Sequence, residues 1–182
     1  YQWSINGMVV HSGAQLNGGL VGGDSVQCSV VVSDGQDTSS AMTSAVSIGH
    51  SLPSVSQVMV QPSQPTASDD ILCSYSYSDV DGDVDASIVS WTVNGINAGE
   101  GLHLSDTGSQ IQRGDSLGCS VEARDSQDIG NIENSASVTV INDFPVVGSV
   151  SITPYTIQTD STLSLNVSVE DADPDSIALN IS

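Results

Sequence analysis

The amino-acid sequence predicts an all-β fold built of repeated β-sandwich units, and three observations lead to that class. Residues that favour helices are scarce, whereas Val, Ser, Thr, Asp and Gly are frequent, as is typical of short strands joined by polar turns. Apolar and polar residues alternate along several short segments, which indicates strands with one buried face. The sequence also repeats itself with a period of roughly 90 residues.

Four sets of matching residues carry this repeat. Members of each set lie between 88 and 92 positions apart, and small loop insertions account for the drift. The matches are, in chain order, residues 3–7 with 91–95, residues 23–28 with 114–119, Pro53 and Pro62 with Pro145 and Pro154, and residues 79–83 with 171–175.

The phase of the repeat divides the chain into one complete domain and two partial ones. Pro53 and Pro145 each separate two strand-like runs, so residues 53–143 form the complete domain. Residues 1–52 match only its expected third to seventh strands, and residues 144–182 match only its first two. Two explanations stay open: the sequence is a window of a longer tandem array, or neighbouring copies complete each other by strand complementation.

Within the complete domain, about seven strands are expected, and alternation and turn residues locate six of them. Asn94-Gly95 is a strong hairpin-turn signal, because both positions reach positive φ readily, and Gly114-Asp115 marks another turn. The strands assigned in this way cover residues 55–60, 71–77, 88–93, 102–104, 116–123 and 135–141.

Three residues of this domain resemble the immunoglobulin arrangement. Cys73, Trp91 and Cys119 fall on the expected second, third and sixth strands; in immunoglobulin domains a disulfide bridges the two sheets and a Trp packs on it. The resemblance implies a Cys73–Cys119 disulfide and an oxidising compartment, the alternative being two buried free thiols. Cys28 lacks an equivalent partner, since Leu165 stands where Cys73 stands in the complete domain. Either it packs against Leu165 of a neighbouring copy or its partner lies outside this sequence.

The chain as a whole resembles the tandem immunoglobulin-like repeats, cadherin-like and PKD-like, of microbial extracellular surface or filament proteins. The resemblance rests on the Asp-rich run before Trp91, the Asn94-Gly95 turn, the Gly-Asp turn before Cys119, and the string VTVINDFP at 138–145. It implies an extracellular or cell-surface location. The last string looks like the cadherin junction, where Asn and Asp between domains bind calcium, although the Glu-based ligand motifs of cadherins are absent.

Clustered carboxylates predict calcium as a cofactor. Residues 79–85 carry Asp at alternate positions, and Ca²⁺ takes 6–8 oxygen ligands, which such a loop supplies. A second acidic loop is expected at the same end of the sandwich, and the last unit repeats the pattern beside the linker; a solvated acidic loop is the alternative at each place. The candidate ligands are Asp79, Asp81, Asp83, Asp85, Asp125, Asp128, Asp171, Asp173, Asp175, Asn142 and Asp143.

Charge and motifs exclude several classes of function. The net charge is −20, with only 2 cationic residues, so the basic patch that nucleic acids require is missing. No apolar run approaches the ~20 residues of a spanning helix, so no membrane insertion is expected. Asn166 and Asn180 stand in N-x-S glycosylation sequons. No catalytic arrangement is recognisable, and we expect no enzyme activity.

We therefore expect a structural module of an extracellular filament or cell-surface stalk, stiffened by calcium. Its partners would be copies of itself or adjacent repeats of a longer chain. The alternative is an adhesin or carbohydrate-binding module that recognises surface glycans. That reading requires paired aromatic side chains on an exposed face, and the sequence contains only 2 Trp, 4 Tyr and 1 Phe.

Overall fold

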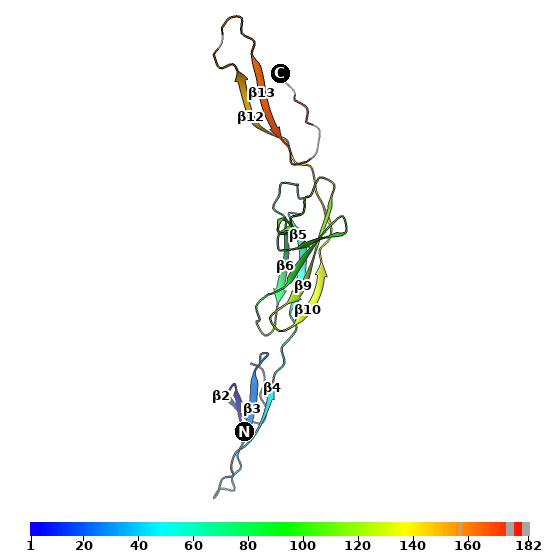
Figure 1. Cartoon of the computed structure of the whole chain (residues 1–182). Helices are drawn as coiled ribbons and strands as arrows, with labels where there is room; N and C mark the ends of the chain where they lie inside the picture. Colours follow the sequence, from blue (N-terminus) through cyan, green and yellow to red (C-terminus); the bar gives the residue numbers. More distant parts are fainter. Residues whose placement is uncertain (157, 174–176, 180–182) are drawn as a thin grey trace. The chain divides into compact units, whose positions relative to one another are not determined.

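The computed structural model of the protein describes residues 1–156, 158–173 and 177–179. As predicted, these residues form an all-β structure of antiparallel sheets, whose single helical element is a short 3₁₀ turn. The strands (Figure 1) are β1 (Gln2–Ile5), β2 (Met8–Ser12), β3 (Ser25–Val30), β4 (Met42–Ser47), β5 (Ser54–Gln61), β6 (Leu72–Ser78), β7 (Ile88–Val93), β8 (Ile96–Glu100), β9 (Ser116–Arg124), β10 (Ile129–Asn134), β11 (Val138–Thr139), β12 (Val146–Thr153) and β13 (Ser164–Glu170).

The chain divides into two compact units. One contains residues 1–55, 77–87 and 123–131, and the other contains residues 56–76, 88–122 and 132–182. Neither set of boundaries coincides with the domains proposed from the repeat, which therefore stay a prediction. In the part of the chain that the structure describes, no helix is long and apolar enough to cross a membrane.

The first four strands form an antiparallel sheet in the order β2-β1-β3-β4. Trp3 lies opposite Cys28, and Ile5 lies opposite Val26, on the paired strands β1 and β3. Residues that oppose each other in an antiparallel pair share one face of the sheet, so these four make an apolar face. Val26 is buried, while Trp3, Ile5 and Cys28 are only partly covered.

Two further sheets supply the main core. Strands β5 and β6 form one, and β10-β9-β7-β8 with β11 form the other. Every second residue of β9 is buried, as expected for a strand with one face toward a core. The fully covered side chains come from both sheets, which is consistent with a β-sandwich. They include Val60 and Cys73 from β5 and β6, and Trp91, Leu117 and Val121 from β7 and β9.

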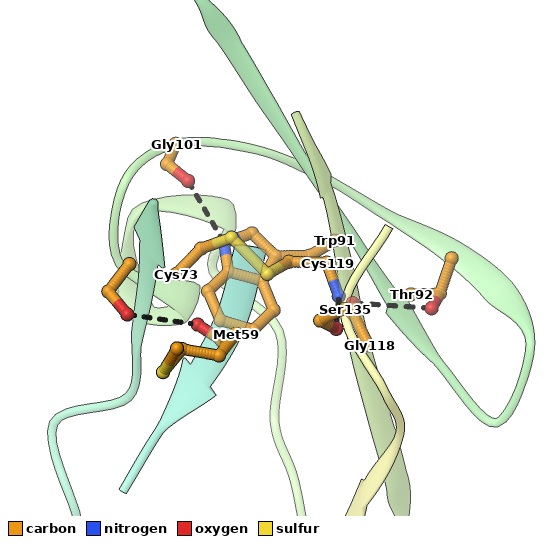
Figure 2. The surroundings of a disulfide bond; sticks show 9 residues. Met59, Cys73, Trp91, Thr92, Gly101, Gly118, Cys119 and Ser135 are labelled. Carbon is orange, nitrogen blue, oxygen red and sulfur yellow. Dashed lines mark hydrogen bonds between the residues drawn. A yellow bond between two sulfur atoms is a disulfide. The ribbon is translucent and has the colours of Figure 1, made fainter. Parts of the chain in front are cut away.

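The disulfide that the immunoglobulin resemblance implies is present. Cys73 of β6 and Cys119 of β9 are bonded, with their Cα atoms 6.2 Å apart. Trp91, on β7, is 0 % exposed and lies opposite Cys119 of β9. Figure 2 shows its ring beside the disulfide. Its indole N–H donates to the carbonyl of Gly101 at 2.9 Å, so the buried ring leaves no unpaired donor. The alternative of two free thiols is wrong.

The strand expected at 102–104 is reduced to a single antiparallel bridge between His103 and Leu72, and that expected at 135–141 is reduced to the two residues of β11. Strand β8 directly follows the Asn94-Gly95 turn, and the chain then makes a 3₁₀ turn at Leu104–Thr107. Leu104 is buried and explains the apolar signal read there as a strand. Near the other segment, β10 precedes a two-residue β11. Strands β8 and β10 were not predicted. Most of their residues are exposed, so the alternation of apolar and polar residues that indicates a strand is weak there.

Strands β12 and β13 pair with each other as an antiparallel hairpin, drawn in orange in Figure 1. Val150 lies opposite Val167, and Ile152 lies opposite Leu165. These apolar side chains share one face, yet Val150 and Ile152 are 61 % and 53 % exposed.

Equivalent side chains of the two repeats make the same hydrogen bonds between the same atoms. The indole of Trp3 donates to the carbonyl of Gly13 at 2.9 Å, as Trp91 does to Gly101. At the turns, the Asn6 amide donates to Asp24 at 2.8 Å, as Asn94 does to Asp115 at 2.8 Å. The matching segments therefore share local geometry as well as amino-acid sequence.

Candidate functional site

The acidic loop at 79–85 is organised by its first carboxylate. Oδ1 of Asp79 accepts the backbone N–H groups of Asp81 at 2.8 Å and Asp83 at 3.1 Å. Such Asx-type bonds let a short aspartate stand in for a backbone turn, and Gly82 supplies a φ of 82° that other residues adopt only with strain. The sequence thus folds this loop tightly around Asp79.

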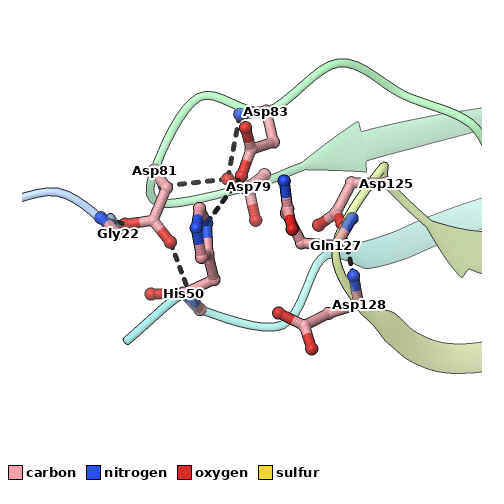
Figure 3. Close-up of polar contacts among 9 residues, drawn as sticks. Gly22, His50, Asp79, Asp81, Asp83, Asp125, Gln127 and Asp128 are labelled. Atoms are coloured by element: carbon pink, nitrogen blue, oxygen red, sulfur yellow. Dashed lines mark hydrogen bonds and ion pairs between the residues drawn. The ribbon is translucent and has the colours of Figure 1, made fainter. Parts of the chain in front are cut away.

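The second acidic loop uses the same device. Oδ1 of Asp125 accepts the N–H groups of Gln127 and Asp128, both at 2.6 Å. The backbone beside it, at Arg124, accepts the N–H of Ala86 at 2.8 Å, which ties the two loops together. Figure 3 shows both loops, so the predicted meeting of the two acidic loops is present.

Three buried oxygen atoms among these loops have no hydrogen-bond partner. They are Oδ2 of Asp79, Oδ2 of Asp125 and the hydroxyl of Tyr77. Burial raises the pKa of Tyr77, and the negative charges of Asp79, Asp125, Asp85 and Asp83 raise it further. An unpaired buried carboxylate oxygen is costly, and a hard cation is the ligand that relieves it. The unpaired oxygens of Asp79 and Asp125 therefore keep these two aspartates as candidate ligands of the predicted calcium site.

Asp81, unlike Asp79 and Asp125, binds backbone groups outside the two acidic loops. Its Oδ1 accepts the backbone N–H of Gly22 at 2.5 Å, and its Oδ2 accepts that of Ser51 at 2.5 Å. The hydrogen bonds from Ser51 and Gly22 hold the pKa of Asp81 below its usual value, because they stabilise the ionised form. We call this arrangement the first clamp. Its carboxylate oxygens are engaged by backbone donors, unlike the free oxygens of Asp79 and Asp125.

His50 lies beside the first clamp and was not expected there. Its Nδ1 is 3.3 Å from Oδ2 of Asp83. Ligand atoms of His50, Asp81 and Asp83 all lie within 4.8 Å of one another, a spacing that a metal ion could bridge. The only sequence signal for His50 is its repeat position, 92 residues before the predicted ligand Asn142.

The same clamp recurs one repeat later. Asp173, the equivalent of Asp81, accepts the N–H of Arg113 at 3.2 Å on Oδ1 and that of Asp143 at 2.6 Å on Oδ2. Arg113 and Asp143 occupy the repeat positions of Gly22 and Ser51. Asp173 is 4 % exposed, and its own N–H donates to Oδ1 of Asp171 at 3.0 Å. We call this arrangement the second clamp.

The side chains of the predicted linker ligands contact other groups, although the backbone N–H of Asp143 reaches Asp173. The Asp143 side chain turns to Ser68 and accepts its N–H at 3.0 Å and its hydroxyl at 2.8 Å. Burial opposes ionisation of Asp143, but the hydrogen bonds from Ser68, Thr66 and Ala67 together outweigh it and hold its pKa below the usual value. Oδ1 of Asn142 accepts a hydrogen bond from the guanidinium of Arg113 at 2.9 Å. The calcium site predicted from Asn142, Asp143 and the last acidic cluster therefore stays a prediction.

The remaining predicted residues are placed as follows. Oδ1 of Asp85 accepts the N–H of Ser87 at 2.8 Å, within the first acidic loop. Asn166 is exposed on β13, as its sequon requires, and its amide is 3.3 Å from the hydroxyl of Thr153. Asp175 and Asn180 lie outside the described residues.

Comparison with protein-family models, with curated proteins and with solved structures finds no match to the chain.

Proposed function

We propose that this protein is a structural module of an extracellular filament or cell-surface stalk, made of consecutive immunoglobulin-like domains that clamps hold one to the next. Strand complementation or tandem linkage in a longer chain joins the domains. The observation that carries the proposal is the repetition of the clamp. Asp81 and Asp173 each accept two backbone N–H groups from equivalent positions of the preceding repeat.

Mechanical stiffness follows from where each clamp acts. In the proposed domain division, Asp81 belongs to the complete domain, whereas Gly22 and Ser51 belong to the partial domain before it. Two charge-assisted hydrogen bonds that one carboxylate accepts from two separate segments oppose both bending and twisting at the boundary.

Calcium strengthens the same boundary in this proposal. The unpaired Oδ2 atoms of Asp79 and Asp125 offer two ligand oxygens, and Tyr77 adds a third buried oxygen beside them. An ion there would neutralise part of the charge on the loop that carries Asp81. Extracellular calcium is abundant enough for weak sites of this kind, and a disulfide is compatible with an oxidising compartment.

A distance measurement between spin labels tests the stiff boundary. Labels on Thr43→Cys and Asn97→Cys, in a Cys28→Ser background, lie on opposite sides of the first clamp in the proposed division; both sites are exposed. We expect a narrow distance distribution that broadens in Asp81→Asn, because an amide nitrogen cannot accept the second N–H. Equal widths in the two proteins would remove the clamp as a structural device and, with it, the proposed function.

Calcium titration against thermal unfolding tests the cofactor. The melting temperature should rise with calcium in the wild type and stay constant in Asp79→Asn/Asp125→Asn, since ligands that bind only the folded state stabilise it. The charge-matched control Glu100→Gln/Asp160→Asn removes two exposed acids outside the loops and should keep the response. An unchanged melting temperature in the wild type would refute the calcium site. Binding to a glycan array that survives EDTA would instead favour the adhesin.

A further inference from the structure

His50 and two carboxylates of the first acidic loop form a cluster of nitrogen and oxygen atoms beside the first clamp (Figure 3). Ligand atoms of His50, Asp81 and Asp83 all lie within 4.8 Å of one another, and Nδ1 of His50 is 3.3 Å from Oδ2 of Asp83. All three residues belong to the same compact unit. The side chains of His50 and Asp83 are 30 % and 29 % exposed, so the cluster is partly covered and still open to ions from solvent.

Gly22 leaves a space beside this cluster that any other residue would fill. A Cβ atom at position 22 would lie 2.8 Å from Nδ1 of His50 and 2.7 Å from Oδ2 of Asp81, which is closer than Cβ atoms approach other groups in proteins. Gly22 does not have a positive φ, so backbone freedom does not explain the glycine. The absence of a side chain at position 22 instead keeps the atoms of His50 and Asp81 accessible.

The second clamp has a cation of its own at the equivalent place, and this is an independent observation. Arg113 stands 91 positions after Gly22, and its guanidinium donates to Oδ1 of Asn142 at 2.9 Å. Asn142 stands 92 positions after His50. The backbone N–H of Arg113 also makes the clamp bond, so that bond does not by itself require glycine. The first clamp therefore has an open space and an imidazole where the second has a permanent cation and an amide.

We propose that the first clamp binds a divalent transition-metal ion of the Zn²⁺ type through Nδ1 of His50 and carboxylate oxygens of Asp81 and Asp83, where the second clamp has the Arg113 side chain. An imidazole nitrogen combined with carboxylate oxygens suits Zn²⁺, whereas Ca²⁺ takes oxygen ligands. Each oxygen of Asp81 accepts one backbone N–H and keeps a further lone pair for an ion. Three protein ligands leave the remaining coordination to water.

This site is separate from the proposed calcium site and goes beyond the proposed function. The calcium ligands are the unpaired Oδ2 atoms of Asp79 and Asp125, and neither residue belongs to the cluster around His50. An ion held by His50 and Asp83 would join two segments that are distant in the chain, whether or not the protein is part of a filament. Binding of the two ions can therefore be tested separately.

Isothermal titration calorimetry with Zn²⁺ tests the site on the whole untagged chain, in a Cys28→Ser background that removes the free thiol as a competing ligand. We expect the tightest binding event to involve one ion per chain. His50→Asn, which copies the second clamp, and Asp83→Asn should each weaken it by about tenfold or more, since even outer-shell partners of metal ligands contribute about that much. The control His103→Asn should bind as tightly as the parent. His103 lies 2.8 Å from Asp70, but among the described residues this pair belongs to no three-ligand cluster.

Nuclear magnetic resonance of the histidine rings separates direct ligation from a loss of folding in the variants. In the Cys28→Ser protein, Zn²⁺ should shift the ring signals of His50 and leave those of His11 and His103 in place. The inference is overturned if Zn²⁺ does not bind below millimolar concentration, if it binds without shifting His50, or if His50→Asn binds it equally well.

The calcium variant distinguishes the two sites. Asp79→Asn/Asp125→Asn should still bind Zn²⁺, because neither residue is a ligand in the cluster of His50. If this variant loses Zn²⁺ binding while His50→Asn keeps it, the ion occupies the calcium site and the inference is wrong. A melting temperature that responds to calcium, together with no Zn²⁺ binding at His50, refutes this inference and leaves the proposed function intact. Zn²⁺ binding at His50 in a chain whose boundary is not stiff refutes the proposed function alone.

Discussion

At the scale of single residues, the aspartates of this protein act mainly as acceptors for backbone N–H groups. Asp79, Asp125 and Asp34 close loops in this way, and Asp81 and Asp173 form the two clamps. Asp is short enough to reach nearby backbone donors, which explains why 18 of the 22 acidic residues are Asp rather than Glu.

The first prediction at the scale of residues concerns how the stability that Asp81 contributes depends on pH. The folded pKa of Asp81 lies below its ordinary value of 3.8, so its stabilising effect is complete above that value and is lost as the pH falls through the folded pKa. The difference in free energy of unfolding between wild type and Asp81→Asn should therefore be largest above pH 4 and shrink toward pH 2. Urea unfolding followed across this range measures it; a difference that grows with acid would contradict the clamp.

A second prediction concerns the disulfide. It closes a loop with a sequence separation of 46, for which the chain-entropy model gives about 4 kcal/mol of stabilisation. Cys73→Ala/Cys119→Ala should lose roughly this amount in denaturant unfolding, with about a further 1 kcal/mol for the packing lost around Trp91. Cys28→Ala is the matched control, since Cys28 is a free and only partly covered thiol, and its effect should stay under about 1 kcal/mol.

At the scale of elements, the hairpin turns are fixed by side chains as much as by backbone preference. Asn94 has a φ of 53°, and its amide oxygen accepts the N–H of Ser116 at 2.9 Å while its nitrogen donates to Asp115. Asn6 repeats this geometry, with a φ of 51° and a bond from the N–H of Ser25 at 2.9 Å. Each Asn therefore joins its hairpin to the strand that follows the Gly-Asp turn.

Substitution of Asn94 separates the two contributions. Asn94→Gly keeps the positive φ but loses both side-chain hydrogen bonds, at a cost of about 1–2 kcal/mol. Asn94→Ala loses the bonds and must also adopt the left-handed region, which adds about 1 kcal/mol. Thermal unfolding should thus rank wild type above the Gly variant and the Gly variant above the Ala variant. Asn97→Ala, on the exposed part of β8, is the control and should change little.

At the scale of the whole molecule, charge and apolar faces oppose each other. A net charge of −20 repels neighbouring copies, whereas burial of the exposed apolar side chains of the first sheet and the hairpin would favour contact between them. Repulsion between exposed charges is screened over about 10 Å at 0.1 M salt. Assembly should therefore depend on ionic strength.

Self-association should strengthen as a monovalent salt is added. Sedimentation velocity in 0.02 M and 0.3 M KCl, both with EDTA, should show a shift toward larger species at the higher concentration, because screening weakens repulsion and leaves apolar burial in place. Leu165→Asn, which removes an exposed apolar side chain from the hairpin face, should sediment as a smaller species at both concentrations. Dissolution of wild-type oligomers by salt would mean that ion pairs, not apolar faces, hold them.

Much of this architecture could be predicted from local sequence. Alternation located β5, β6, β7 and β9, because a strand with one covered face leaves a period of two in the sequence. The disulfide followed from the resemblance of Cys73, Trp91 and Cys119 to the immunoglobulin arrangement. Strands β8 and β10 leave weak alternation, since most of their residues stay exposed. The acidic loops were recognisable by composition, yet the hydrogen-bond partners of each aspartate within them were not.

The sequence by itself determined the all-β class, the repeat and the residues available for each loop, since these depend on contacts between near neighbours. Only the tertiary structure decided that Asp81 and Asp173 bind backbone groups, that Asp143 turns to Ser68, and that the orphan oxygens belong to Asp79 and Asp125. All these aspartates look alike in sequence. What separates them is which N–H groups distant in the chain come within hydrogen-bonding distance, and that depends on how the segments pack.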